Sequence, residues 1–191
     1  MNRCGAVLVG LLLVLLSGCS SPLVRPGQRV ALKSFSLSSP IAWSQFSNGR
    51  ERIWTLDGPM LNRVWMIDGV KPGEQVFLRP RPNGRRKGEG ALFQAGISDS
   101  EAIDLIAAGL REQGIDNLRV RDIAPRPFGQ RPGFAFALDF ASRRGLRYRG
   151  FGAGEVADDT LSFVLFFAPA EHYYGRDLHA ARQVIESIRS R

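Results

Sequence analysis

The sequence FAFALDFA, residues 134–141, alternates large apolar side chains with small or polar ones. A period of two residues is that of a β-strand with one face on a hydrophobic core. Two further strands are predicted after it, at residues 146–156 and 160–168, with the turn residues Asp158 and Asp159 between them. Such hairpin succession predicts an antiparallel sheet.

Three glycines, Gly150, Gly152 and Gly154, alternate within the first of these two strands. They leave one face of the strand without side chains. This pattern predicts either a β-bulge or a covering helix packed close to the backbone.

Two amphipathic helices are predicted to cover the sheet. The first begins at Ser98, which forms a capping box with Glu101, and ends at Gly114, a left-handed stop. The second is expected to begin with Asp177 as its N-cap. Each helix must bury one apolar stripe, formed by Ile103, Ile106, Ala107 and Leu110 in the first and by Leu178, Ala181, Ile185 and Ile188 in the second.

The remaining strands are predicted upstream of the first helix and directly after it. Their expected ranges are residues 29–35, 41–46, 51–56, 61–69, the shorter 75–78, and 117–123. Both alternating sets of residues 61–69 contain apolar side chains, so this strand should be covered on two faces. The fold class is therefore α+β, a largely antiparallel sheet packed with two amphipathic helices.

The element order resembles the Mog1/PsbP-like α/β/α sandwich. The resemblance spans roughly residues 29–191, and the segment ARQVIESI, residues 181–188, is similar to the closing helix of that group. Members of the group have diverse binding roles. The resemblance implies a sheet between helices and carries over no catalytic residue.

The N-terminus has the pattern of an export signal. Arg3 precedes an apolar run of eleven residues from Ala6 to Leu16. At about 1.5 Å per residue such a run reaches about 16 Å, roughly half of a bilayer core. A basic start, a short apolar middle and small residues at the end predict a signal peptide that is removed.

The quartet Leu16-Ser17-Gly18-Cys19 resembles the lipobox of bacterial lipoproteins. The resemblance implies that Cys19 is acylated and becomes the N-terminus; the alternative is an ordinary signal peptide. We expect residues 1–18 to be the signal, 19–28 a lipidated tether and 29–191 one globular domain. Ser20 in place of Asp implies, by the sorting pattern of that family, anchoring in the outer membrane facing the periplasm.

The charge of the chain favours anionic partners. It contains 26 Lys and Arg residues against 18 Asp and Glu, a formal net charge of +8. Nucleic acid is not expected in an exported protein, and residues 79–90 contain no aromatic side chain for base stacking. Their basic residues either grip the phosphates of anionic lipid or form a solvated loop without a ligand: Arg79, Arg81, Arg85, Arg86 and Lys87.

No pattern in the sequence predicts catalysis, a metal or a cofactor. There is no nucleophile elbow, Walker loop or zinc-protease motif, and His172 and His179 are too far apart to share a small ion. Cys4 falls in the signal, so no disulfide is available within the domain. Four carboxylates are candidates for paired acids, but three of them lie at turn positions, where Asp is common for backbone reasons: Asp57, Asp139, Asp158 and Asp159.

Trp43, Trp54 and Trp65 recur at equal intervals and belong either to the core or to the lining of a groove. Taken together, the sequence predicts a cell-envelope lipoprotein with a non-catalytic binding or assembly domain. Its expected partners are the membrane, through the lipid anchor, and an envelope protein or anionic lipid. The alternative is a carrier of a lipid or small apolar ligand in a cleft between sheet and helix.

Overall fold

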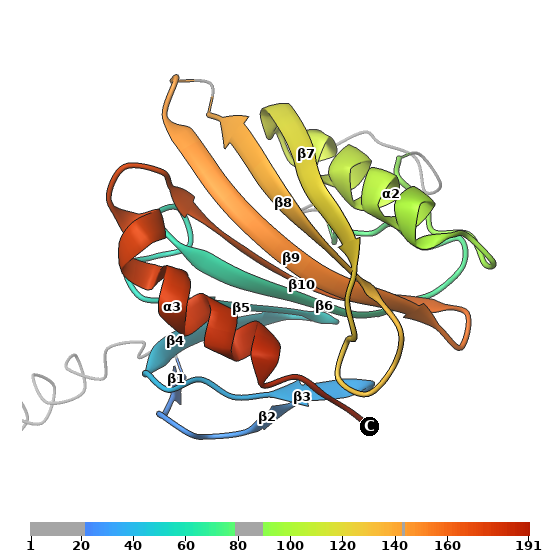
Figure 1. Ribbon diagram of the computed structural model, residues 1–191, viewed down its shortest axis with the longest axis horizontal. Helices are drawn as coiled ribbons and strands as arrows, with labels where there is room; N and C mark the ends of the chain where they lie inside the picture. The colour runs from blue at the N-terminus through green and yellow to red at the C-terminus, as the bar shows by residue number, and fades with distance from the viewer. Residues whose placement is uncertain (1–21, 79–89, 143) are drawn as a thin grey trace, which may run out of the picture.

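The computed structural model describes residues 22–78, 90–142 and 144–191. Within these ranges eight strands form one antiparallel sheet in the order β1-β4-β5-β6-β10-β9-β8-β7, with a helix on each face (Figure 1). Two meanders therefore meet at the central strands β6 and β10. The elements are β1 (Leu23–Val24), β4 (Trp43–Asn48), β5 (Glu51–Thr55), β6 (Arg63–Val70), α2 (Asp99–Glu112), β7 (Asp116–Pro125), β8 (Phe134–Ala141), β9 (Arg147–Ala157), β10 (Thr160–Pro169) and α3 (Tyr173–Glu186).

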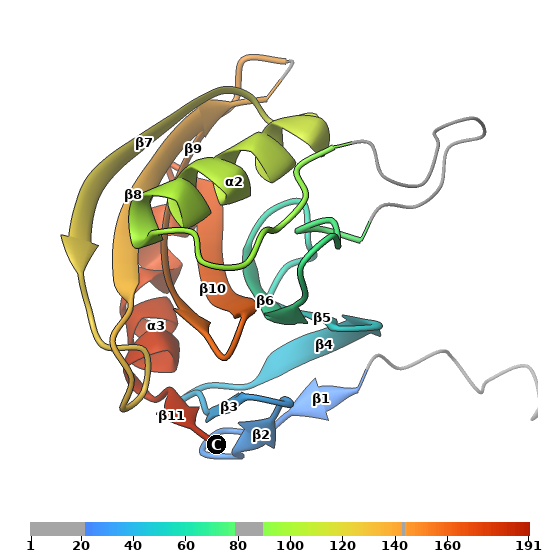
Figure 2. The ribbon, with the colours of Figure 1, turned by 90° about the vertical axis from the view of Figure 1, so that its right-hand side faces the viewer.

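A small second sheet closes one end of the molecule. Its order is β11-β3-β2, from β2 (Val30–Ala31), β3 (Phe35–Leu37) and β11 (Arg189–Ser190), so the C-terminal end of the chain pairs with an N-terminal strand. Figure 2 shows this sheet below β4, at the opposite end of the molecule from α2. The two ends of the domain are therefore joined by main-chain hydrogen bonds.

The sheet separates two hydrophobic cores, one under each helix. β10 contributes Phe163 and Leu165 to the core under α2, and Val164 and Phe166 to the core under α3. β6 also has buried apolar side chains on both faces, as predicted for residues 61–69. The α/β/α arrangement of layers confirms the predicted α+β fold class.

The first predicted helix is confirmed in its start, its stripe and its stop. The Ser98 side chain accepts from the Glu101 backbone, and the Glu101 side chain accepts from the Ser98 backbone. Gly114 has a φ of 84°. The N–H groups of Gly114 and Ile115 return to the carbonyls of Arg111 and Leu110, which is a Schellman ending.

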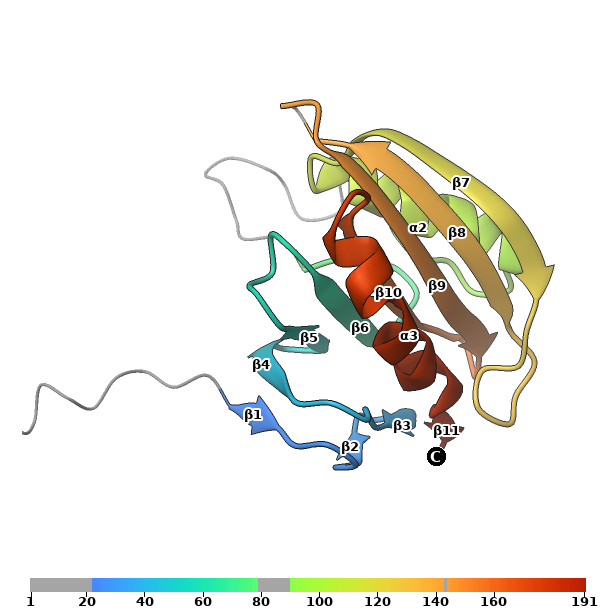
Figure 3. The ribbon, with the colours of Figure 1, turned by 60° about the vertical axis from the view of Figure 1, so that its left-hand side comes forward.

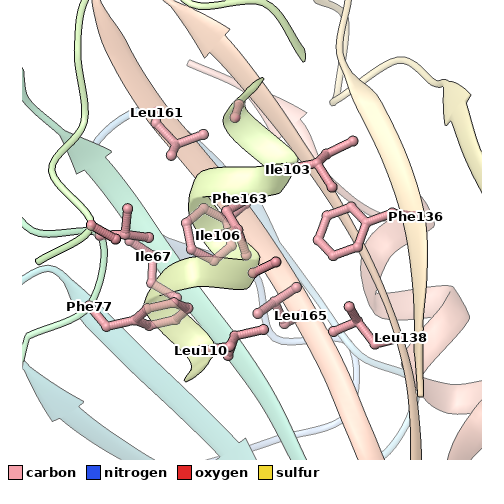
Figure 4. Close-up of a cluster of buried hydrophobic side chains, with 14 of the residues drawn as sticks. Ile67, Phe77, Ile103, Ile106, Leu110, Phe136, Leu138, Leu161, Phe163 and Leu165 are labelled. Carbon is pink, nitrogen blue, oxygen red and sulfur yellow. The ribbon is translucent and has the colours of Figure 1, made fainter. Parts of the chain in front are cut away.

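The glycine row of β9 makes room for rings from its neighbours. Gly152 lies opposite Phe136 of β8 and Leu165 of β10, and Gly154 lies opposite Phe134 and Phe163. Figure 4 shows Phe136, Phe163 and Leu165 of these neighbours packed beside α2. Because the register of β9 runs without a shift on either side, the covering helix is correct and the bulge is wrong.

Several predicted boundaries differ from the structure. Residues 29–35 are not one strand, because the chain reverses after Ala31 and β2 pairs with β3. Residues 75–78 form only a bridge from Gln75 to Leu92. Leu23 and Val24, expected within the tether of residues 19–28, form β1 and pair with β4.

Asp177 is not the N-cap of the second helix. α3 begins at Tyr173, and Asp177 lies inside it, 3% exposed. Its carboxylate accepts from Arg176 and from Asn62, whose amide is 2.9 Å away. This Asp is therefore a buried acceptor that joins α3 to the turn after β5.

Candidate functional site

A cavity of about 240 Å³ opens where α2 ends. α2 stops at Glu112 and the chain turns at Gly114, and residues near the ends of β6, β8, β9 and β10 line the facing wall. The cavity therefore lies between the sheet and the end of a helix. Its lining residues are Met60, Arg63, Trp65, Gln113, Gly114, Ile115, Phe140, Ala141, Ser142, Tyr148 and Phe167.

Aromatic rings form much of the cavity wall. Phe140 and Tyr148, paired across β8 and β9, are stacked with centroids 4.8 Å apart. Phe167 of β10 meets Phe140 edge-on at 5.4 Å. Trp65 of β6 completes the set. Walls of this kind suit an apolar or aromatic group of a ligand.

Arg63 places a positive charge among these rings. Its guanidinium carbon lies 4.8 Å from the Phe167 ring centroid and 5.4 Å from that of Trp65. Its Nε donates to the Pro59 carbonyl at 2.7 Å. Burial lowers the pKa of Arg63, yet an arginine remains charged at neutral pH.

No carboxylate of the described residues forms an ion pair with Arg63. Arg63 is half-buried, and its guanidinium contacts one carbonyl and two rings but no acid among the described residues, so it is available to pair with an anion from outside the chain. A second donor lies nearby, since the buried Nε2 of Gln113 finds no acceptor among the described residues. The Tyr148 hydroxyl, in contrast, donates to the Met60 carbonyl at 3.1 Å.

A larger, shallow hollow of about 710 Å³ adjoins the cavity and shares Phe140, Ala141 and Tyr148 with it. Figure 3 shows that α3 does not reach across β7 and β8, so this side of both strands is left uncovered. We call the hollow itself, as defined by its lining residues, the basic hollow. Its other lining residues are Asn117, Arg119, Arg121, Asp139, Arg147, Arg149, Ala170 and Glu171.

The arginines of the basic hollow outnumber its acids. Arg119, Asp139 and Arg149 are aligned across β7, β8 and β9. Asp139 also pairs with Arg121 at 2.5 Å, which raises the pKa of that arginine. Arg147 reaches Glu171 at 3.2 Å, and both of these side chains are largely exposed. The hollow therefore presents net positive charge.

Two of the residues singled out in the sequence belong to these sites, Trp65 to the cavity and Asp139 to the basic hollow. Cys19 and the basic segment from Arg79 to Lys87 are outside the described residues. His179 is exposed on α3, and the described ranges contain no cluster of three or more metal-ligating side chains. Trp43 and Trp54 are buried under α3, so the groove interpretation is wrong for them, and Trp65 alone of the three lines the cavity.

The four candidate carboxylates do not form a catalytic pair. Asp158 and Asp159 occupy the turn between β9 and β10, where both have positive φ. Asp57 is held by Arg176, whose hydrogen bond lowers the pKa of that carboxyl. Asp139 lies apart from them in the basic hollow.

The comparisons with known proteins concern the fold. No protein-family model matches the chain, and no curated protein matches it. The solution structure of cyanobacterial PsbP from Synechocystis sp. PCC 6803 aligns with a TM-score of 0.50 and 11% identity, covering 92% of this chain and 96% of that one. The fold resembles that of cyanobacterial PsbP.

A crystal structure from Bacteroides thetaiotaomicron VPI-5482 aligns with a TM-score of 0.46 and 12% identity over 90% of this chain. The chain spans about half of its length, 49%. At these identities the likeness concerns architecture alone. Among the described helices, none has the length and apolar character to cross a membrane.

Proposed function

We propose that the protein is a cell-envelope lipoprotein, anchored through acylated Cys19 in the outer membrane and facing the periplasm. Its domain serves as a non-catalytic binding module. The export pattern and the Leu16-Ser17-Gly18-Cys19 quartet support the anchor. The binding role is supported by the cavity at the end of α2.

The observation that carries the binding role is Arg63. A guanidinium set between two rings, without an acid partner among the described residues, is arranged to receive an anion. The rings around it favour an anion attached to an apolar body. The ligand group is therefore a carboxylate or phosphate on a small apolar or aromatic moiety.

The cavity volume favours a binding module over a lipid carrier. Pockets that enclose a whole small molecule usually measure about 300–1,000 Å³. At about 240 Å³ this cavity suits one group of a larger partner. A carrier of lipid in the cleft between sheet and helix is the second candidate, because the cavity lies in that cleft.

The test compares two probes that differ only in charge. 4-Fluorobenzoate and neutral 4-fluorobenzamide are added to the full-length protein in neutral detergent, and binding is followed by ¹⁹F NMR line broadening, with micelles alone as the blank. We expect the benzoate to bind more tightly. Arg63→Met keeps an unbranched apolar stem but removes the charge. It should abolish the preference for benzoate and leave the binding of benzamide unchanged.

Arg182→Gln serves as the matched control, since Arg182 is exposed on α3 outside the cavity. It should bind both probes as the wild type does. Equal binding of both probes by the wild type would contradict the proposal. Native mass spectrometry supplies a second readout, because co-purification of one lipid per chain would favour the carrier instead.

A further inference from the structure

We propose that the basic hollow binds one strand of a carboxylate-bearing wall polymer. The inference rests on the proposed function, because the anchor determines which side of the domain faces the bilayer. It names the partner class of the site. Three features of the hollow support it: its charge, its floor and its place in the sheet.

The charge of the hollow is suited to repeated carboxylates. Four arginines line it against the two acids Asp139 and Glu171. A guanidinium offers paired donors that match the two oxygens of a carboxylate. Arg119 and Arg149 lie two strands apart in register, so they can engage different groups along one strand of polymer.

The floor of the hollow is low. Two of its lining residues, Ala141 at the end of β8 and Ala170 just after β10, are alanines. Arginine side chains that stand around short ones leave room for an extended chain to lie across the strands.

The hollow is far from the tether. Val24 of β1 is buried and paired with Trp43, and Cys19 precedes Val24 by five residues, which span at most about 18 Å. β8 is six strand positions away from β1 in the sheet, or roughly 29 Å. The hollow therefore lies at the edge of the sheet opposite the anchored strand β1, where a wall polymer rather than a lipid headgroup is the expected partner.

The cavity and the hollow meet at the adjoining ends of β8 and β9, where Phe140, Ala141 and Tyr148 belong to the lining of both. The rings of Phe140 and Tyr148 face the core under α2, whereas Asp139 and Arg149 stand on the opposite face of the sheet. The two sites therefore lie on opposite faces of the sheet and adjoin only at these strand ends.

The experiment measures binding of full-length protein in neutral detergent to three probes by thermophoresis. The probes are alginate oligosaccharide, neutral dextran, and dihexanoylphosphatidylglycerol below its micelle concentration. The wild type should bind alginate, and added salt should weaken this binding because the arginines are exposed. The triple variant R119Q/R147Q/R149Q should lose about tenfold in affinity.

The matched control is K71Q/R182Q/R189Q, which removes the same charge at exposed positions outside the hollow. It should bind alginate as the wild type does. The inference is overturned if the wild type does not bind alginate, if both triple variants lose the same amount of alginate affinity, or if the phospholipid binds more tightly than alginate. Circular dichroism checks that each variant is folded.

The fluorobenzoate test separates this inference from the proposed function. The arginine triple variant retains Arg63 and should bind fluorobenzoate unchanged. If alginate binding is absent while fluorobenzoate binding depends on Arg63, only the wall-polymer inference fails. If fluorobenzoate binding is also absent, the proposed binding role fails with it.

Discussion

Gly152 is the position at which adding one methyl group should disturb the core most directly. It lies in the middle of β9 under α2. A Cβ placed there would be 2.5 Å from Leu165 Cδ2, 2.9 Å from Phe136 Cζ and 3.0 Å from the Val164 carbonyl oxygen. Ordinary contacts of this kind are 3.4–4 Å. Leu165 and Phe136 must therefore move by roughly half an ångström or more inside a close-packed core.

The expected cost follows from that displacement. Overpacking a core by one methyl group costs about 1–3 kcal/mol. Gly→Ala returns about 0.4–1 kcal/mol by restricting the unfolded chain. With an overpacking cost near the middle of its range, Gly152→Ala should therefore lower the free energy of unfolding by about 1–2 kcal/mol. For a domain of this size the melting temperature should fall by about 2–8 °C.

Urea denaturation and thermal melting followed by circular dichroism provide the measurement. Gly175→Ala is the control, because Gly175 is exposed in α3 and a Cβ there meets nothing within 4 Å. The control should be unchanged or more stable, since alanine favours helix. In G152A/F136L, where the ring is shortened, the loss should be smaller than the sum of the two single losses. Equal stability of G152A and wild type would refute the reasoning.

Three further predictions concern other buried or charged groups. Burial raises the pKa of Glu155, which faces Arg131, Asp158 and Asp68, above its ordinary value of 4.5. As the pH rises, the unfolded chain therefore loses this proton before the folded protein does, and the free energy of unfolding falls above pH 4.5. In urea titrations Glu155→Gln should be more stable than wild type at pH 8 and should lose this advantage at pH 4. Asn62→Ala should lower the free energy of unfolding by about 2–4 kcal/mol, because the amide of this 1% exposed residue bonds Thr55, Asp57 and Asp177; a loss below 1 kcal/mol in the same titrations would contradict it. Replacing the five basic residues of segment 79–87 by Gln should weaken co-sedimentation with anionic vesicles of a C19S form at low salt, and unchanged binding would end that proposal.

The elements that the sequence predicted correctly are those with dense local signals. The capping box of Ser98 and the glycine after α2 are short-range features, so they define the helix without knowledge of its partner. The alternation in β8 likewise appears directly as buried and half-buried positions. The prediction of Asp177 as an N-cap was wrong because Asp favours N-caps in general, whereas this Asp lies in the helix interior and is hydrogen-bonded by distant Asn62 and neighbouring Arg176.

The candidate site was not predictable in the same way. Gln113, Tyr148 and Phe167 belong to separate elements that meet only when α2 packs on the sheet. One signal was present: Arg63 lies in a strand expected to be covered on both faces, where a charge is out of place. The arginines of the basic hollow come from β7 and β9, and only the register across β8 brings them together.

Mass spectrometry of the N-terminal peptide, prepared from the protein in its native membrane, tests the anchor on which the proposed location depends. The account predicts a peptide that begins at Cys19 and is heavier by a diacylglyceryl group on sulfur, and an uncleaved chain when Cys19 is replaced by Ser. A wild-type peptide with an unmodified thiol, or with Gly18 still joined to Cys19, would contradict it.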